Sequence, residues 1–176
     1  MTTIYCSKKL NDFLGKEMLS ASNNSVGNEL GGWNGHLFNY QRKKYLILIN
    51  NKTYYALLFP PIKKADLRNF ENLFLQKLLH QLVYDQIISE SETLVLLQKL
   101  LPVSFSKTNN DKKAIGTLND FIYRFKVELD YFGWSDQDFY NINNKLNDTL
   151  VGASRPKQGD YGRPMEDMKQ LINTKT

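Results

Sequence analysis

The strongest hydrophobic pattern in the chain is a stripe of apolar side chains over residues 114–132. Apolar residues recur there at alternating spacings of three and four, which is the period of one face of an α-helix. They are Ile115, Leu118, Ile122, Phe125, Leu129 and Phe132. The pattern predicts a long helix whose apolar face packs on the core of the protein.

Two more helices are predicted in the middle of the chain. The first covers residues 63–87, where apolar side chains keep the helical period and Asp66 is the expected N-cap. The second covers residues 89–101, and Ser89 and Glu92 have the spacing of a capping box at its start.

Shorter helices are predicted near the C-terminus from their end signals. Residues 135–152 form a predicted helix that Ser135 or Asp136 caps and Gly152 closes. Pro164 is a residue favoured at the first helical position, so a short final helix is expected to begin there.

Five segments have the alternating pattern or the continuous apolar run that is typical of β-strands. The third of them contains a continuous apolar run, as in a central strand that is buried on both faces. A helical turn that Asn11 or Asp12 caps is expected over residues 11–18, after the first strand. The five predicted strands cover residues 2–10, 36–40, 44–49, 54–59 and 103–108.

Strands and helices do not alternate along the chain as they would in a doubly wound sheet. The order predicts an α+β fold with a small antiparallel or mixed sheet of about four to five strands and helices packed on one face. We expect a single globular domain over residues 1–176. Residues 19–32 are a predicted flexible loop, and residues 153–163 are a predicted loop before the short C-terminal helix.

The composition is that of a soluble globular protein with a moderate positive charge. The 176 residues carry a net charge of +5, which permits an anionic partner and does not require one. The N-terminal segment lacks the apolar core of a signal peptide, and no run approaches the roughly 20 apolar residues of a membrane span. We therefore expect a cytoplasmic protein that does not insert into a membrane.

A basic segment precedes and enters the long predicted helix. Lys107, Lys112 and Lys113 flank the helix start, where free backbone N–H groups and the helix dipole attract anions. Thr108 lies among them, and Arg124 extends the positive charge along the helix. This arrangement predicts an anion-binding loop. The alternative is a solvated loop that leads into a well-capped helix.

A second basic stretch connects two predicted strands. Arg42 and Lys43 lie in it, among the aromatic residues Tyr40, Tyr45, Tyr54 and Tyr55. Cations interleaved with aromatic rings on a sheet can stack nucleic-acid bases. The alternative is a hairpin edge whose lysines discourage pairing with another chain.

The sequence indicates no catalytic residue, no metal site and no cofactor. His36 and His80 are far apart in the sequence and have no clustered acidic partners. The single cysteine, Cys6, leaves no internal disulfide and no zinc site built on cysteines, and it is expected to be a packed core residue.

An acidic stretch spans the end of the long predicted helix and the residues after it, and it contains Glu128, Asp130, Asp136 and Asp138. We expect these carboxylates to cap a helix and to face solvent. A contact between this stretch and the basic hairpin of a second copy would make a homodimer, so the oligomeric state stays open.

Four segments of the chain follow one another in a distinctive order. They are IYCSKKL, then Trp33 followed by LFNYQRKKYLILINNKTYY, then KTNNDKKAIGTLNDF, and finally YGRPMEDMKQL. With these motifs the chain resembles an uncharacterised bacterial family, domain of unknown function 6933, over nearly its whole length. The resemblance implies a single cytoplasmic α+β domain and no particular activity. The family tends to have a histidine directly after the tryptophan, where this chain has Asn34.

The GTLND part of the third motif places Asn119 early in the long predicted helix, where asparagine has a poor intrinsic propensity. One interpretation is that the Asn119 side chain bonds the preceding loop, which is the usual local use of asparagine. The other is that Thr108, Arg42 and Asn119 meet in one pocket, with His36 as a further member. We favour the local hydrogen bond.

The expected function is that of a non-enzymatic binding or regulatory module whose basic surface binds nucleic acid or an acidic protein surface. One alternative is a small enzyme that acts on nucleic acid or a phosphorylated substrate. The other is a protein–protein interaction factor of the toxin or phage type, with Trp33 or Trp134 in an exposed apolar patch. The candidate binding residues are Arg42, Lys43, Lys107, Thr108, Lys112, Lys113, Asn119 and Arg124.

Overall fold

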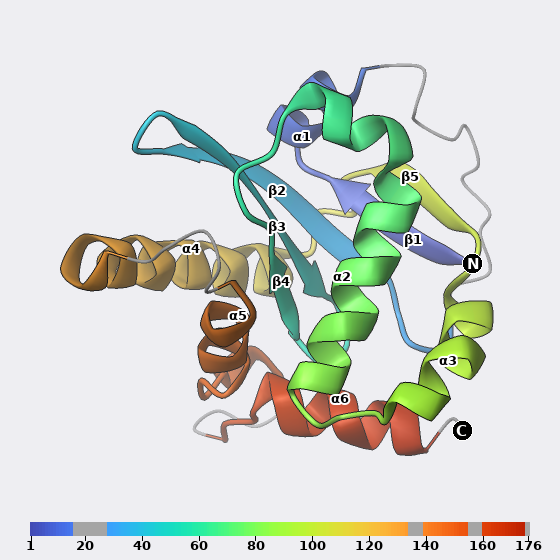
Figure 1. Cartoon of the computed structure of the whole chain (residues 1–176). Coiled ribbons are helices and arrows are strands. Elements are labelled where there is room, and N and C mark those ends of the chain that lie inside the picture. The colour runs from blue at the N-terminus through green and yellow to red at the C-terminus, as the bar shows by residue number, and fades with distance from the viewer. Residues whose placement is uncertain (16–27, 134–138, 155–159, 175–176) are drawn as a thin grey trace.

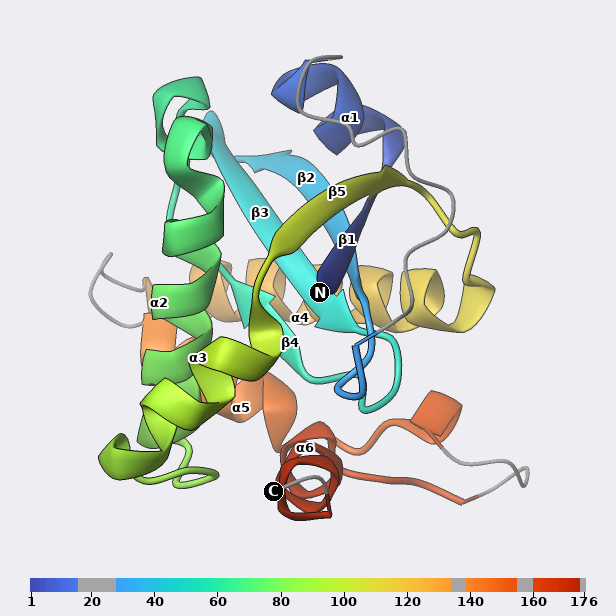
Figure 2. The same cartoon turned by 90° about the vertical axis from the view of Figure 1, so that its right-hand side faces the viewer.

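Five β-strands form one mixed sheet in the order β4-β3-β2-β1-β5 (Figures 1 and 2). The computed structural model describes residues 1–15, 28–133, 139–154 and 160–174. β1 is parallel to β2 and β5, whereas β3 is antiparallel to β2 and β4. The predicted single α+β domain with a mixed sheet is confirmed. The strands are β1 Thr2–Cys6, β2 Trp33–Tyr40, β3 Lys43–Asn50, β4 Ala56–Leu58 and β5 Val103–Lys107.

Helices cover both faces of the sheet, so the expectation of helices on one face only is wrong. In Figure 2, α4 runs behind the strands, and the buried side chains of α2 belong to the core cluster on the opposite face of the sheet. The short 3₁₀ helices are η2 Lys64–Asn69, η3 Glu90–Glu92 and η4 Gly152–Ser154. The α-helices of the described residues are α1 Lys8–Leu14, α2 Phe70–Tyr84, α3 Thr93–Leu100, α4 Lys112–Phe132, α5 Phe139–Asn147 and α6 Pro164–Asn173.

The central strand β3 shows why two helical layers are needed. Its apolar run is buried on both faces, as the sequence predicts. Leu46 and Leu48 belong to a core cluster with α1, α2, α3 and α6. Ile47 and Ile49 belong to a second cluster with α4 and α5. Each of these four side chains is 0% exposed, so a helix layer on one side alone would leave half of the run in water.

Several helix ends agree with the sequence prediction. The capping box is present, because the Ser89 N–H donates to a Glu92 carboxylate oxygen at 2.7 Å. Pro164 starts α6 as expected. The long helix begins at Lys112 and ends at Phe132, where Gly133 adopts a left-handed conformation with φ of 59°. Glycine is the residue that most readily allows this conformation at a helix end.

Other helix ends differ from the prediction. The turn expected over residues 11–18 is α1, which begins at Lys8 because the Ser7 hydroxyl caps the Leu10 N–H at 3.4 Å. Asp66 lies within η2, where its carboxylate accepts from the Lys63 N–H, and α2 begins only at Phe70.

Two further predictions concern α5 and the loops. The helix ends at Asn147, and Gly152 begins η4 instead of closing α5. The expected caps Ser135 and Asp136 lie outside the described residues. So do residues 19–27 of the predicted loop over 19–32 and residues 155–159 of the predicted loop over 153–163. None of the described helices has both the length and the apolar character needed to cross a membrane.

Two buried asparagines of α5 satisfy the free edge of β4. The Asn143 amide accepts from the Leu58 N–H at 2.7 Å and donates to the Leu58 carbonyl at 3.0 Å. Asn147 makes the same pair of bonds with Ala56, also at 2.7 and 3.0 Å. Both asparagines are 0% exposed. The side chains of α5 therefore replace the neighbouring strand that β4 lacks.

We predict that Asn143→Ala lowers the free energy of unfolding by about 2–4 kcal/mol, because it leaves the N–H and the carbonyl of Leu58 buried without partners. Urea unfolding measures the change. Asn141→Ala on the same helix is the matched control and is expected to stay within about 0.5 kcal/mol of the parent protein. Equal losses in the two variants would show that β4 does not depend on the Asn143 amide.

Candidate functional site

The start of α4 is a capped helix end. Asp111 is the N-cap, and one oxygen of its carboxylate accepts from the Lys113 and Ala114 N–H groups at 3.1 and 3.0 Å. This carboxylate occupies the place that an anion would take at a free helix N-terminus. The positive charges of Lys112 and Lys113 are therefore available to the flank of the helix and not to its end.

That flank forms one wall of a groove. A hollow of about 380 Å³ lies between the first half of α4 and the segment 149–153, with the Tyr161 ring at its rim. A second hollow of about 230 Å³ lies between α4 and α5. Arg124 and Thr149 line both hollows, so the two are adjacent. We call the two hollows together the α4 groove.

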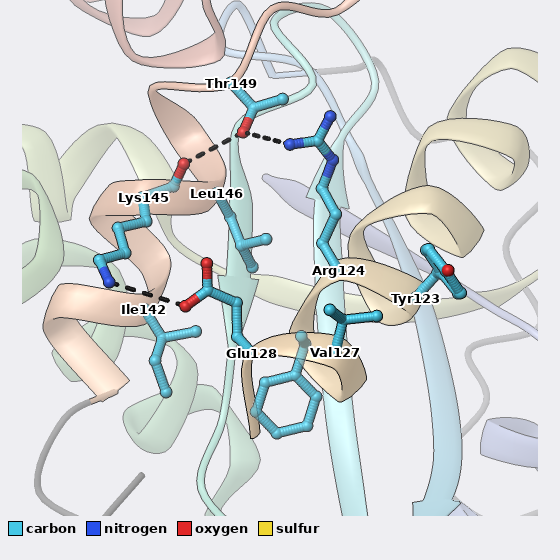
Figure 3. Close-up of a pocket in the computed structure, with 9 residues that line it drawn as sticks. Tyr123, Arg124, Val127, Glu128, Ile142, Lys145, Leu146 and Thr149 are labelled. Atoms are coloured by element: carbon cyan, nitrogen blue, oxygen red, sulfur yellow. Dashed lines mark hydrogen bonds and ion pairs between the residues drawn. The ribbon is translucent and has the colours of Figure 1, made fainter. Parts of the chain in front are cut away.

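Figure 3 shows how the second hollow is held together. The Thr149 hydroxyl donates to the Lys145 carbonyl at 3.1 Å, and its oxygen accepts from the Arg124 guanidinium at 3.5 Å. The Lys145 ammonium lies 3.6 Å from the Glu128 carboxylate on the facing helix. These contacts join α4 to α5 across the groove and place the Arg124 guanidinium beside Thr149.

The α4 groove combines positive charge with exposed aromatic rings. The cations on its lining are Lys112, Lys113, Arg124 and Lys145, and the acids are Asp120 and Glu128. Two tyrosines, Tyr123 and Tyr161, line the groove while 70% and 61% exposed. An excess of cations beside exposed rings is suited to a polyanion that carries flat groups.

The basic hairpin is a separate feature. Gln41 and Arg42 both have positive φ, 45° and 61°, which makes a tight two-residue turn between β2 and β3. The Tyr40 hydroxyl donates to the Asp130 carboxylate on α4, and Gln41 donates to it at 3.2 Å. The acidic stretch thus contacts the hairpin within one chain. Arg42 and Lys43 are exposed at the turn, outside the α4 groove.

The tyrosines of the hairpin region are mostly unavailable for base stacking. Tyr45, Tyr54 and Tyr55 are 3%, 6% and 0% exposed. Nor is the hairpin a sheet edge, because β2 and β3 are interior strands. Both interpretations offered for this basic stretch therefore lose their structural basis.

Thr108 and Asn119 line a different cavity, of about 350 Å³, together with His36. The predicted pocket of Thr108, Arg42 and Asn119 thus forms in part, since Arg42 is not among its lining residues. Within the described ranges Asn119 makes no hydrogen bond to the preceding loop. The Thr108 hydroxyl instead accepts from the Asn110 N–H at 3.1 Å. Lys107 is exposed at the end of β5.

Sequence reasoning missed a buried polar network around Asp85. The Asp85 carboxylate accepts from the Tyr55 hydroxyl, from Gln81 at 3.0 Å and from Asn144 at 2.8 Å. Burial raises the pKa of Asp85 and lowers that of the neighbouring Lys77 to about 8. Because its contacts join α2, α5 and Tyr55 inside the protein, the network is structural.

Sequence reasoning also gave Asn34 no structural role. The even spacing of Asn34 and His36 along β2 is the signal that would have placed the two side chains on one face of the strand.

Other candidate functional side chains among the described residues do not form a recognisable site. Cys6 is 2% exposed and packs in the core as expected, and burial raises the pKa of its thiol to about 12. Among residues 1–15, 28–133, 139–154 and 160–174, no three His, Cys, Asp or Glu side chains are grouped as metal ligands would be. Trp33 is 1% exposed and packs edge-on against Phe74, whereas Trp134 lies outside the described residues.

The fold and the groove define an α+β protein with a cationic depression beside its longest helix. The chain belongs to the family described as Domain of unknown function (DUF6933), whose model matches residues 3–167. No curated protein matches the chain.

We predict that His36 titrates below its ordinary pKa of 6.5, because burial and, second, the charge of Lys9 disfavour the imidazolium. Since the unfolded chain then binds the proton more readily, the His36 contribution to stability is present above pH 6.5 and is lost as the pH falls. NMR titration of the imidazole measures the pKa. Lys9→Gln should raise it without restoring 6.5, and a His36 pKa at or above 6.5 in the parent protein would contradict the prediction.

Proposed function

We propose that the chain is a non-enzymatic binding module that holds single-stranded nucleic acid in the α4 groove. The observation that carries the proposal is the joint lining of one groove by Lys112, Lys113 and Arg124 and by the exposed rings of Tyr123 and Tyr161. Proteins that bind single strands combine a positive groove that follows the phosphates with aromatic rings on which bases stack. A nucleic-acid partner also fits the cytoplasmic location expected from the sequence.

The dimensions and the walls of the groove favour a single strand over a duplex. Lys112 and Arg124 are twelve residues apart on α4, which corresponds to about 18 Å of helix and is long enough for a few nucleotides. The side of α4 that carries these cations faces α5 and the segment 149–153. A helix reads a duplex by inserting its free face into the major groove, and this face is not free.

An acidic protein surface would use the same cations, and it is an outcome that the test below distinguishes. An enzyme acting on nucleic acid or a phosphorylated substrate is the second candidate, because His36, Thr108 and Asn119 line one cavity. The absence of Arg42 from that lining removes the cation assigned to such a site. A protein-interaction factor that uses Trp33 is disfavoured, because this ring is buried.

We predict that labelled single-stranded RNA binds with strong salt dependence and more tightly than duplex DNA. Contact with three phosphates corresponds to a slope of log K against log salt of about −2 for a single strand. Lys112→Glu/Lys113→Glu should weaken binding at least about tenfold and bring the slope near −0.7, since one phosphate contact is left. Fluorescence anisotropy across a salt series measures both quantities.

The matched control is Lys63→Glu/Lys64→Glu, which changes the net charge equally on the exposed start of η2, outside the groove. This control should bind nearly as the parent protein does. Equal weakening in the two variants would mean that only the overall charge matters. No binding of RNA at low salt would reject the nucleic-acid proposal and direct the search to acidic protein partners.

A further inference from the structure

The cavity that contains His36 lies on the sheet face covered by α4, above β1 and β2. Successive side chains of a strand point to opposite faces. Ile4 and Cys6 of β1 belong to the core cluster on the α2 side, so Tyr5 points to the α4 side. By the same alternation, Asn34 and His36 of β2 point away from that cluster. Tyr5, Asn34 and His36 all line the cavity.

The cavity lies at a topological switch point of the sheet, where the chain leaves two adjacent strands toward opposite faces. β1 and β5 are adjacent and parallel. The chain leaves β1 into α1, whose Leu10 and Leu14 pack on one face, and leaves β5 toward α4, whose Leu118 packs on the other. Residues just after both strands, including Ser7 and Thr108, line the cavity. Open sheets bind ligands at the carboxyl ends of parallel strands where such a switch occurs.

Asn34 is exceptional among the buried asparagines of the described residues. Asn143 and Asn147 each bond a backbone N–H and a carbonyl of β4. Asn50 donates to the Leu30 carbonyl at 2.9 Å and accepts from backbone N–H groups of its own turn. Asn34 is 4% exposed, and its Nδ2 has no hydrogen-bond partner among the residues that the structure describes. A buried donor without an acceptor is costly unless a ligand completes it.

The other polar groups of the lining can also donate hydrogen bonds. The ammonium of Lys8 and the hydroxyls of Ser7 and Thr108 reach the cavity, and the amide of Asn119 lies at its α4 side. None of the described lining residues carries a carboxylate. Polar groups that can all donate, with one cation and no carboxylate, match a ligand that presents several oxygen acceptors and negative charge.

We propose that this cavity is a second binding site, for a small molecule bearing an oxyanion group, and that the Asn34 amide donates to that group. The volume of about 350 Å³ is within the range of small-ligand sites. His36 stands beside Asn34, and its lowered pKa leaves it neutral at pH 7, so it contributes a hydrogen bond and no charge.

This site is independent of the α4 groove. Ile115, Leu118 and Asn119 line the cavity, whereas Lys113 and Arg124 line the groove. At 100° per residue these two sets occupy opposite sides of α4. The proposal of a ligand site in this cavity therefore does not depend on nucleic-acid binding in the α4 groove.

The test uses inorganic phosphate and malonate as probes, each compared with sodium chloride at the same ionic strength. The readout is the ¹H–¹⁵N signal of the Asn34 side-chain amide, together with the melting temperature. We expect a saturable downfield shift of the Asn34 amide protons with a dissociation constant of about 1 mM, as befits a ligand of few atoms. A response to phosphate alone assigns a phosphoryl group, and a response to malonate alone assigns a carboxylate.

Two variants and a control complete the experiment. Asn34→Leu removes the unpaired donor, so the free protein should melt about 4 °C higher while the melting shift caused by the anion is lost. Lys8→Gln, at an exposed position, should weaken binding about tenfold without that rise. Asn39→Leu makes the same chemical change at an exposed position of β2 and should bind as the parent protein does.

The inference is overturned if neither anion moves the Asn34 amide signal in a saturable way. It is also overturned if sodium chloride reproduces the shift, or if Asn39→Leu loses binding as Asn34→Leu does. A saturable shift that Asn34→Leu and Lys8→Gln both reduce supports it.

Discussion

The bidentate bonds from Asn143 and Asn147 to the edge of β4 determine how α5 packs against the sheet. Four residues of helix rise about 6 Å, and two residues of strand advance about 6.6 Å. Asparagines four apart on α5 therefore match alternate residues of β4, namely Ala56 and Leu58. The match fixes α5 against the sheet, and Lys145, Leu146 and Thr149 then form the far wall of the α4 groove. The groove exists because an edge strand is completed by a helix.

The helix α4 separates two environments of different chemistry. Its buried side contributes Leu118, Phe121 and Phe125 to the core, which holds the helix across β2 and β3. Cations occupy the flank toward α5, and neutral polar groups occupy the flank toward β1. The Asp111 carboxylate accepts from the first free N–H groups of α4, so the anion-attracting end of the helix is already occupied. An anion would therefore be bound by the cations along the groove and not by the helix end.

Much of the fold could be predicted because its signals are local. The capping box of Ser89 and Glu92 and the apolar stripe of α4 depend on spacing alone, and both are present. The second helical layer is a tertiary property, yet the continuous apolar run of β3 already implied it. A strand buried on both faces needs cover on both, and the expectation of one helical face was inconsistent with that run. The start of α1 was misplaced because Ser7 continues the alternation of β1 while its hydroxyl caps the helix.

The candidate sites could be predicted only in part, because they depend on which residues the topology brings together. Thr108 and Asn119 line one cavity, as the less favoured interpretation expected, since both flank the start of one helix. Arg42 was not part of that cavity, because the antiparallel run of β2 and β3 takes it to the turn at Gln41. Asn34, in contrast, was not predicted as a site residue, because a polar residue after a tryptophan is unremarkable in sequence. Its burial follows from α4 crossing β2, and an unpaired amide there costs about 1–3 kcal/mol out of a typical stability of about 5–15 kcal/mol. A cost of that relative size, beside the carboxyl ends of the parallel strands β1 and β5, is better explained by a role in ligand binding than by imperfect packing.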